Sequence, residues 1–150
     1  MIENIFTDPF YAPLAVLVTA LLLGSILGLE RTLAHKVAGV RTYGLVSMGS
    51  ALFIIIARFV IPTVGAYSFD PMRVAAGVIM GIGFICGGVI IFKDSTLQGL
   101  TTAAGLWVAA GIGMAVGYGL IWLAVFATIA TLVVFTLFWF IEHKLVPKKP

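Results

Sequence analysis

Long apolar segments follow one another along this chain, and short polar stretches separate them. A membrane-spanning helix needs about 20 predominantly apolar residues, and residues 9–29 and 74–92 carry no charge at all. The uncharged segment 95–141 is too long for one crossing, and the glycines of VGYGL at 116–120 suit a tight turn between two crossings. The pattern therefore predicts five transmembrane helices, over residues 10–29, 42–61, 73–92, 100–117 and 120–141.

The composition agrees with a lipid solvent and excludes a soluble domain. The chain is 61% hydrophobic and 10% charged, whereas soluble domains carry about 45–50% apolar and about 25% charged residues. A β-barrel would alternate apolar and polar positions, and these segments do not. The N-terminal MIENIFTDPF has no lysine or arginine, so it is not a secretory signal. We expect an all-α integral membrane protein with one transmembrane domain over residues 1–150.

The basic residues predict an orientation in the membrane. Of nine lysines and arginines, Arg58 and Arg73 lie at the facing ends of the second and third predicted spans, and the remaining seven lie at the opposite ends of the spans or in the tail. Basic residues beside membrane spans mark the cytoplasmic side. The N-terminus is therefore expected outside and the C-terminus in the cytoplasm. The net charge of +3 reflects this topology, and we expect no nucleic acid partner.

Seventeen glycines suggest close packing of helices, because small residues let helix backbones approach in lipid. The third predicted helix carries two glycine faces, which predicts that it is central and that the protein is a homo-oligomer, a dimer by expectation; both faces could instead be buried within one chain. The predicted helix-packing glycines are Gly24, Gly28, Gly77, Gly81, Gly83, Gly87, Gly88, Gly113 and Gly117.

Polar residues gather at the predicted cytosolic ends of four helices. Charges near hydrocarbon usually pair or line a polar cavity, although such residues can also simply mark the boundary. We expect the third helix to end at Lys93-Asp94, Asp94 to pair with Arg41 or Arg31, and Thr101 and Thr102 to cap the next helix. The whole predicted cluster is Glu30, Arg31, Arg41, Thr42, Lys93, Asp94, Gln98, Thr101 and Thr102. No enzymatic motif is present, so we expect no catalytic residues.

Two segments carry a family resemblance. GSILGLERTLAHKVAGVRTYGLVSMGSALF (24–53) and GIGFICGGVIIFKDSTLQGLTTAAGLWVAAGIGMAVGYG (81–119) resemble the two signatures of the bacterial MgtC/SapB membrane proteins. The resemblance implies a multi-pass protein of the bacterial inner membrane. It carries over Glu30, Arg31, Gly39, Arg41 and Thr42 from the first signature, and Asp94, Gly99, Thr101, Thr102 and Trp107 from the second.

The resemblance also links the chain to growth in low magnesium, to virulence and to inhibition of ATP synthase, which makes ATP synthase a possible partner. Virulence members of the family carry a soluble C-terminal domain, and this sequence resembles a short form without one. Two functions follow. The favoured one is a regulator or scaffold of another membrane protein. The alternative is a transporter of Mg²⁺ or another small solute, acting as an oligomer. No cofactor is expected; if a metal binds, Glu30 and Asp94 are its candidate ligands, because Mg²⁺ prefers carboxylate oxygens.

Overall fold

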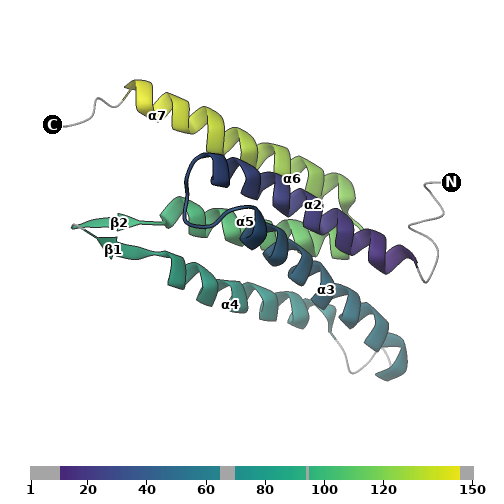
Figure 1. Cartoon of the computed structure of the whole chain (residues 1–150). Coiled ribbons are helices and arrows are strands. Elements are labelled where there is room, and N and C mark those ends of the chain that lie inside the picture. The colour runs from purple at the N-terminus through teal and green to yellow at the C-terminus, as the bar shows by residue number, and fades with distance from the viewer. Residues whose placement is uncertain (1–10, 65–69, 94, 146–150) are drawn as a thin grey trace.

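A bundle of apolar helices makes up the structure, a computed structural model that describes residues 11–64, 70–93 and 95–145 (Figure 1). The elements are α2 (Tyr11–Leu33), α3 (Val40–Val64), α4 (Pro71–Val89), β1 (Ile91–Lys93), β2 (Thr96–Gln98), α5 (Leu100–Gly117), α6 (Ile121–Val133), the π-helix η1 (Val134–Phe138) and α7 (Trp139–Leu145). In this part of the chain, five helices are long and apolar enough to cross a membrane, with α6, η1 and the start of α7 forming the fifth. The predicted number of membrane-spanning helices is confirmed by their length and composition.

The centre of the bundle is α5, which packs against α2, α3, α4 and α6. The predicted third span, α4, packs mainly against α5 and α3 and lies at the edge (Figure 1). The expectation that this helix is central is therefore wrong. Other helices surround α5 because small residues of α5 let the neighbouring helix backbones approach closely. The glycines of α4 make no such contact.

Four of the predicted packing glycines lie at close helix contacts. A Cβ at Gly24 of α2 would lie 2.6 Å from Ser47 Cβ of α3, and one at Gly28 would lie 2.6 Å from Val40 Cα. On α5, a Cβ at Gly113 would overlap the Ser47 carbonyl oxygen. Gly117 likewise leaves room for Ile54, whose Cβ would lie 2.8 Å from an added Cβ. The predicted packing glycines of α4 differ, since no atom of the described chain lies within 4 Å of a Cβ added at Gly77, Gly81, Gly83, Gly87 or Gly88.

The predicted turn at 116–120 is present and joins α5 to α6. Gly119 has φ +84°, and its N–H donates to the Val116 carbonyl at 2.9 Å while the Leu120 N–H donates to the Ala115 carbonyl at 2.8 Å. This pair of bonds is a Schellman motif, which needs a residue with positive φ that glycine adopts without strain.

The connection between α4 and α5 differs from the prediction. The helix ends at Val89, not at residue 92, and an antiparallel hairpin pairs Phe92 with Leu97 and Lys93 with Thr96. Two adjacent glycines, Gly87 and Gly88, disfavour a continuing helix, while the β-branched and aromatic residues that follow favour a strand. The expected boundary at Lys93 is therefore wrong, because Lys93 lies in β1.

The start of α5 is also not capped as predicted. Its N-cap is Gly99, at φ +89°, and no side chain caps this end. A Cβ on Gly99 would overlap the Val89 carbonyl oxygen, so glycine is required both for its backbone angle and for the contact with α4. Thr101 is exposed and Thr102 is buried.

Candidate functional site

Arg31, in the last turn of α2, is the only buried charged residue among those whose burial the structure describes, with 3% of its surface exposed. Its Nε donates to Oε2 of the neighbouring Glu30, whose side chain is 20% exposed. The long side chains of these adjacent residues turn toward each other. The pair lowers the cost of placing a guanidinium inside a membrane helix bundle.

An aromatic ring covers the other side of this guanidinium. Arg31 Cζ lies 3.7 Å from the ring centroid of Phe135, which is buried in η1. A cation over the face of an aromatic ring is attracted by the ring quadrupole, more strongly where water is excluded. The π-helical segment inserts an extra residue into the turn, and such segments are frequent at functional sites.

Tyr43 completes this group from the side of α3. The tyrosine is fully buried, and its hydroxyl donates to the backbone carbonyl oxygen of Thr102 at 3.2 Å. Tyr43 and Phe135 meet at Gly105 of α5, where an added Cβ would overlap the tyrosine hydroxyl and lie 2.6 Å from Phe135 Cζ. We name Glu30, Arg31, Tyr43 and Phe135, packed on Gly105, the arginine cluster. It joins four helical segments at one end of the bundle.

The link between α2 and α3 fixes the position of this cluster. The Thr32 hydroxyl donates to the Gly28 carbonyl at 3.0 Å and accepts from the Val40 N–H at 3.1 Å. At the end of α2, His35 takes a positive φ of 54°, and the Lys36 N–H donates to the Arg31 carbonyl at 2.9 Å. A Schellman motif thus ends the helix one turn after Arg31 with histidine in the place that glycine usually takes.

The structure divides the predicted polar cluster into three parts. Glu30, Arg31 and Thr102 lie in or beside the arginine cluster. Arg41 and Thr101 are exposed near the starts of α3 and α5, and Thr42 is half-buried. Lys93 and Gln98 are exposed on the hairpin. Asp94 lies outside the described residues, so its predicted pairing with Arg41 or Arg31 stays a prediction.

Sequence reasoning missed Tyr43 and Phe135. Tyr43 falls inside the first family signature, directly after Thr42, and that position was its only signal. Phe135 lies in a uniformly apolar span, and nothing in the sequence separates it from the other phenylalanines there. Among the described residues, no group of three or more histidine, cysteine, aspartate or glutamate side chains is arranged to hold a metal ion. Glu30, a proposed metal ligand, is engaged with Arg31.

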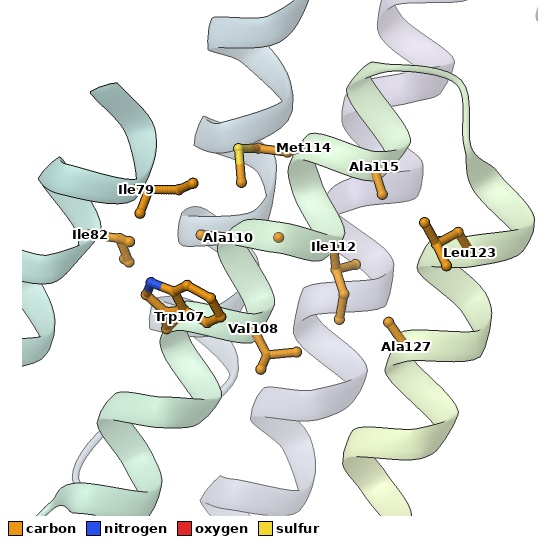
Figure 2. A pocket seen from close by; sticks show the side chains of 11 residues that line it. Ile79, Ile82, Trp107, Val108, Ala110, Ile112, Met114, Ala115, Leu123 and Ala127 are labelled. Atoms are coloured by element: carbon orange, nitrogen blue, oxygen red, sulfur yellow. The ribbon is translucent and has the colours of Figure 1, made fainter. Parts of the chain in front are cut away.

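A second feature is an apolar groove of about 340 Å³ along α5, between α4 and α6. Figure 2 shows Ile79 and Ile82 of α4 on one side, Trp107 of α5 beside them, and Leu123 and Ala127 of α6 on the other side. All lining side chains are apolar apart from the indole N–H of Trp107, so the groove suits a hydrocarbon chain or an apolar helix and offers little to a hydrated ion. It is lined by Ile79, Ile82, Trp107, Val108, Ala110, Gly111, Ile112, Met114, Ala115, Leu123 and Ala127.

The apolar spans and their packing define a multi-pass helical membrane protein. Residues 17–144 match the MgtC family model, so the chain belongs to the MgtC family. No solved structure is significantly similar to it.

Several curated proteins resemble the chain over most of its length. It is 38% identical over 136 residues to the "Putative magnesium transporter YhiD" of Escherichia coli strain K12, a match that covers 89% of this chain and 63% of YhiD. It is 39% identical over 115 residues to "Protein MgtC" of Brucella abortus, which covers 77% of this chain and 46% of that protein. The chain thus spans less than two thirds of these relatives.

Proposed function

We propose that this protein regulates or scaffolds another membrane protein in the bacterial inner membrane, in the context of magnesium homeostasis. Its membership of the MgtC family and its 38% identity to a relative named as a putative magnesium transporter support the magnesium context. Those names describe the relatives, which are longer than the matched segment. ATP synthase, which the family resemblance implies, is the first partner to test.

The observation that carries the proposal is the open glycine surface of α4. Five glycines of this helix have no neighbour within 4 Å of an added Cβ in the described chain. Helices in lipid associate chiefly where small residues allow close approach, and the glycines of α2 and three of the four glycines of α5 are used in that way inside the bundle. The same physical chemistry makes α4 suited to receive a helix of a partner, or of a second copy in the proposed homo-oligomer.

A transporter of Mg²⁺ is the alternative, and the relative's name and the Glu30 carboxylate at the polar end of the bundle favour it. The regulator is preferred because Glu30 already pairs with Arg31, which reduces its attraction for a cation. The groove beside α5 is apolar and suits a hydrated ion poorly.

Site-specific photo-crosslinking in the native membrane tests the regulator. A photoreactive residue replaces Phe84, which is 87% exposed on α4, and in a matched variant it replaces Phe126, which is 66% exposed on α6. We expect one protein adduct from the α4 position and none from the α6 position, with ATP synthase subunits examined first. An adduct at twice the monomer mass would identify a second copy. Equal labelling by both positions would contradict a partner on α4.

A flux measurement tests the alternative directly. The purified protein is placed in liposomes that contain a Mg²⁺-sensitive dye, beside protein-free liposomes. We expect equal Mg²⁺ entry in the two preparations. Protein-dependent entry that disappears in Glu30→Gln, while Lys93→Gln retains it, would replace the regulator by the transporter.

A further inference from the structure

The hairpin between α4 and α5 exposes apolar side chains that no described part of the chain covers. Phe92 is 72% exposed and Leu97 is 59% exposed, and the two are directly paired across the strands. All six strand residues are exposed. A two-stranded hairpin alone is marginally stable in water, so its surroundings decide whether these short strands persist.

The two faces of the hairpin differ in polarity. Side chains alternate between faces along a strand, so the paired Phe92 and Leu97 share one face. The other face carries the Lys93–Thr96 pair and the Ile91–Gln98 pair. The hairpin is therefore amphipathic, with an apolar pair at its middle and a lysine at its outer end.

The lengths of the flanking helices place the hairpin at the membrane surface. The helix α4 has 19 residues and α5 has 18, so each is about 27–29 Å long at 1.5 Å per residue. The hydrocarbon core is about 30 Å thick, so both helices only just cross it and the strands begin at its edge. Figure 1 shows the hairpin continuing outward from the ends of α4 and α5. A three-residue strand extends about 10 Å, comparable to the headgroup layer, which is about 5–8 Å thick on each side.

The charged residues of these connections favour anionic lipid, because Lys36, Arg41 and Lys93 outnumber Asp94, and Glu30 pairs with Arg31. Lys36, in the link between α2 and α3, and Arg41, in the first turn of α3, are exposed. Figure 1 shows this link at the end of the bundle from which the hairpin extends. Juxtamembrane basic residues are attracted to anionic headgroups. The apolar pair also continues the apolar surface of the spans from which the hairpin extends. A second copy of the chain could instead pair with an open strand edge, but three residues offer few hydrogen bonds.

We propose that the hairpin strands Ile91–Lys93 and Thr96–Gln98 dock in the headgroup layer of the membrane. Phe92 and Leu97 face the acyl boundary, and Lys93 lies among anionic lipid phosphates. The open backbone groups of the strand edges are hydrated there, which the hydrocarbon core would not allow. The hairpin thus acts as an interfacial anchor that responds to lipid charge.

Spin-label depth measurements test this proposal. Cys86, the single cysteine, is replaced by alanine, and nitroxide labels are placed in separate full-length variants, Phe92→Cys and Leu97→Cys, so that one apolar residue always remains. Thr96→Cys is the matched control on the opposite face. The proteins are studied in vesicles of phosphatidylcholine with a minor share of phosphatidylglycerol. We expect labels at 92 and 97 to be relaxed more by oxygen than by a water-soluble nickel chelate, and the label at 96 to show the reverse.

Two outcomes would overturn the proposal. Nickel accessibility at 92 and 97 equal to that at 96 would place both faces of the hairpin in water. Spin–spin broadening that disappears on dilution with unlabelled protein would show that a second copy covers the hairpin. The role of Lys93 has its own measurement: Lys93→Gln, or vesicles of phosphatidylcholine alone, should make the labels at 92 and 97 shallower. An unchanged depth would remove anionic lipid from the proposal.

Discussion

Two glycine-rich helices of nearly equal length, α4 and α5, occupy opposite environments in this protein. In the span Leu100–Gly117 of α5, 56% of the residues are buried, against 11% in the span Met72–Val89 of α4. Gly105, Gly113 and Gly117 of α5 lie against α3 or the rings of the arginine cluster, and only Gly111 of this helix is open, whereas all five glycines of α4 lack a close neighbour in the described chain beyond their own helix backbone. In lipid, both interior and exterior residues are apolar, so a glycine pattern shows that close approach is possible and not which helix approaches.

The largest expected effect comes from adding side-chain volume on the two helices. Gly113→Val would force a side chain into the Ser47 carbonyl of α3, and because neither helix backbone can move away freely, we expect a loss of more than about 4 kcal/mol of unfolding free energy. The matched change Gly81→Val on α4 should alter it by less than about 0.5 kcal/mol in the monomer. Detergent-induced unfolding followed by circular dichroism measures both. Equal losses would show that α4 also packs internally.

The next effect concerns charge at the ends of α2 and α4. Glu30→Gln leaves the buried Arg31 guanidinium without its carboxylate, and we expect a loss of about 3 kcal/mol, at the low end for a broken buried pair because Glu30 keeps some exposure. Lys93→Gln, on the exposed hairpin after α4, is the control and should leave the unfolding free energy almost unchanged. The double change Glu30→Gln with Arg31→Met should recover part of the loss, since it removes the uncompensated charge. A Glu30→Gln protein as stable as the parent would argue against the buried pair.

A smaller effect is expected for the hydrogen bond that ties α3 to α5. Tyr43→Phe removes the donor to the Thr102 carbonyl and keeps the ring, so we expect a loss of about 1 kcal/mol. On the outer surface of α4, Phe84→Leu should leave stability unchanged. Detergent-induced unfolding measures the stability of both variants. In addition, the rate of amide hydrogen exchange at the start of α5 should rise in Tyr43→Phe and not in Phe84→Leu. Unchanged exchange there would mean that the hydroxyl does not hold α5.

The smallest effect lies at the end of α2, beside the arginine cluster. His35 has φ 54°, which costs most residues about 1–2 kcal/mol. His35→Gly relieves that cost at the expense of unfolded-state entropy, so we expect a gain of about 0.5–1 kcal/mol. His35→Ala removes the imidazole but keeps the cost of the positive φ, so it should change the unfolding free energy little. Equal stabilisation by His35→Gly and His35→Ala would assign the effect to the ring and not to the backbone.

The candidate site was predicted only in part. The position of Glu30 and Arg31 at a helix end follows from where the apolar span stops, and their importance follows from charge beside hydrocarbon. The burial of Arg31 could not be predicted from the sequence, because it depends on Phe135, which lies 104 residues further along the chain. An apolar span gives no signal for which of its aromatic residues faces inward, particularly where a π-helical turn shifts the register.

The sequence by itself determined the five spans, the Gly119 turn and the membership of the membrane class, because hydrophobic length and glycine backbone freedom are local properties. Only the tertiary structure decided that α5 is central and α4 peripheral, that the third span ends in a hairpin at Val89, and that Arg31 pairs with its own neighbour. These outcomes depend on which helices approach one another. In an apolar solvent, that choice comes from shape and backbone contact, which hydrophobicity along the chain does not encode.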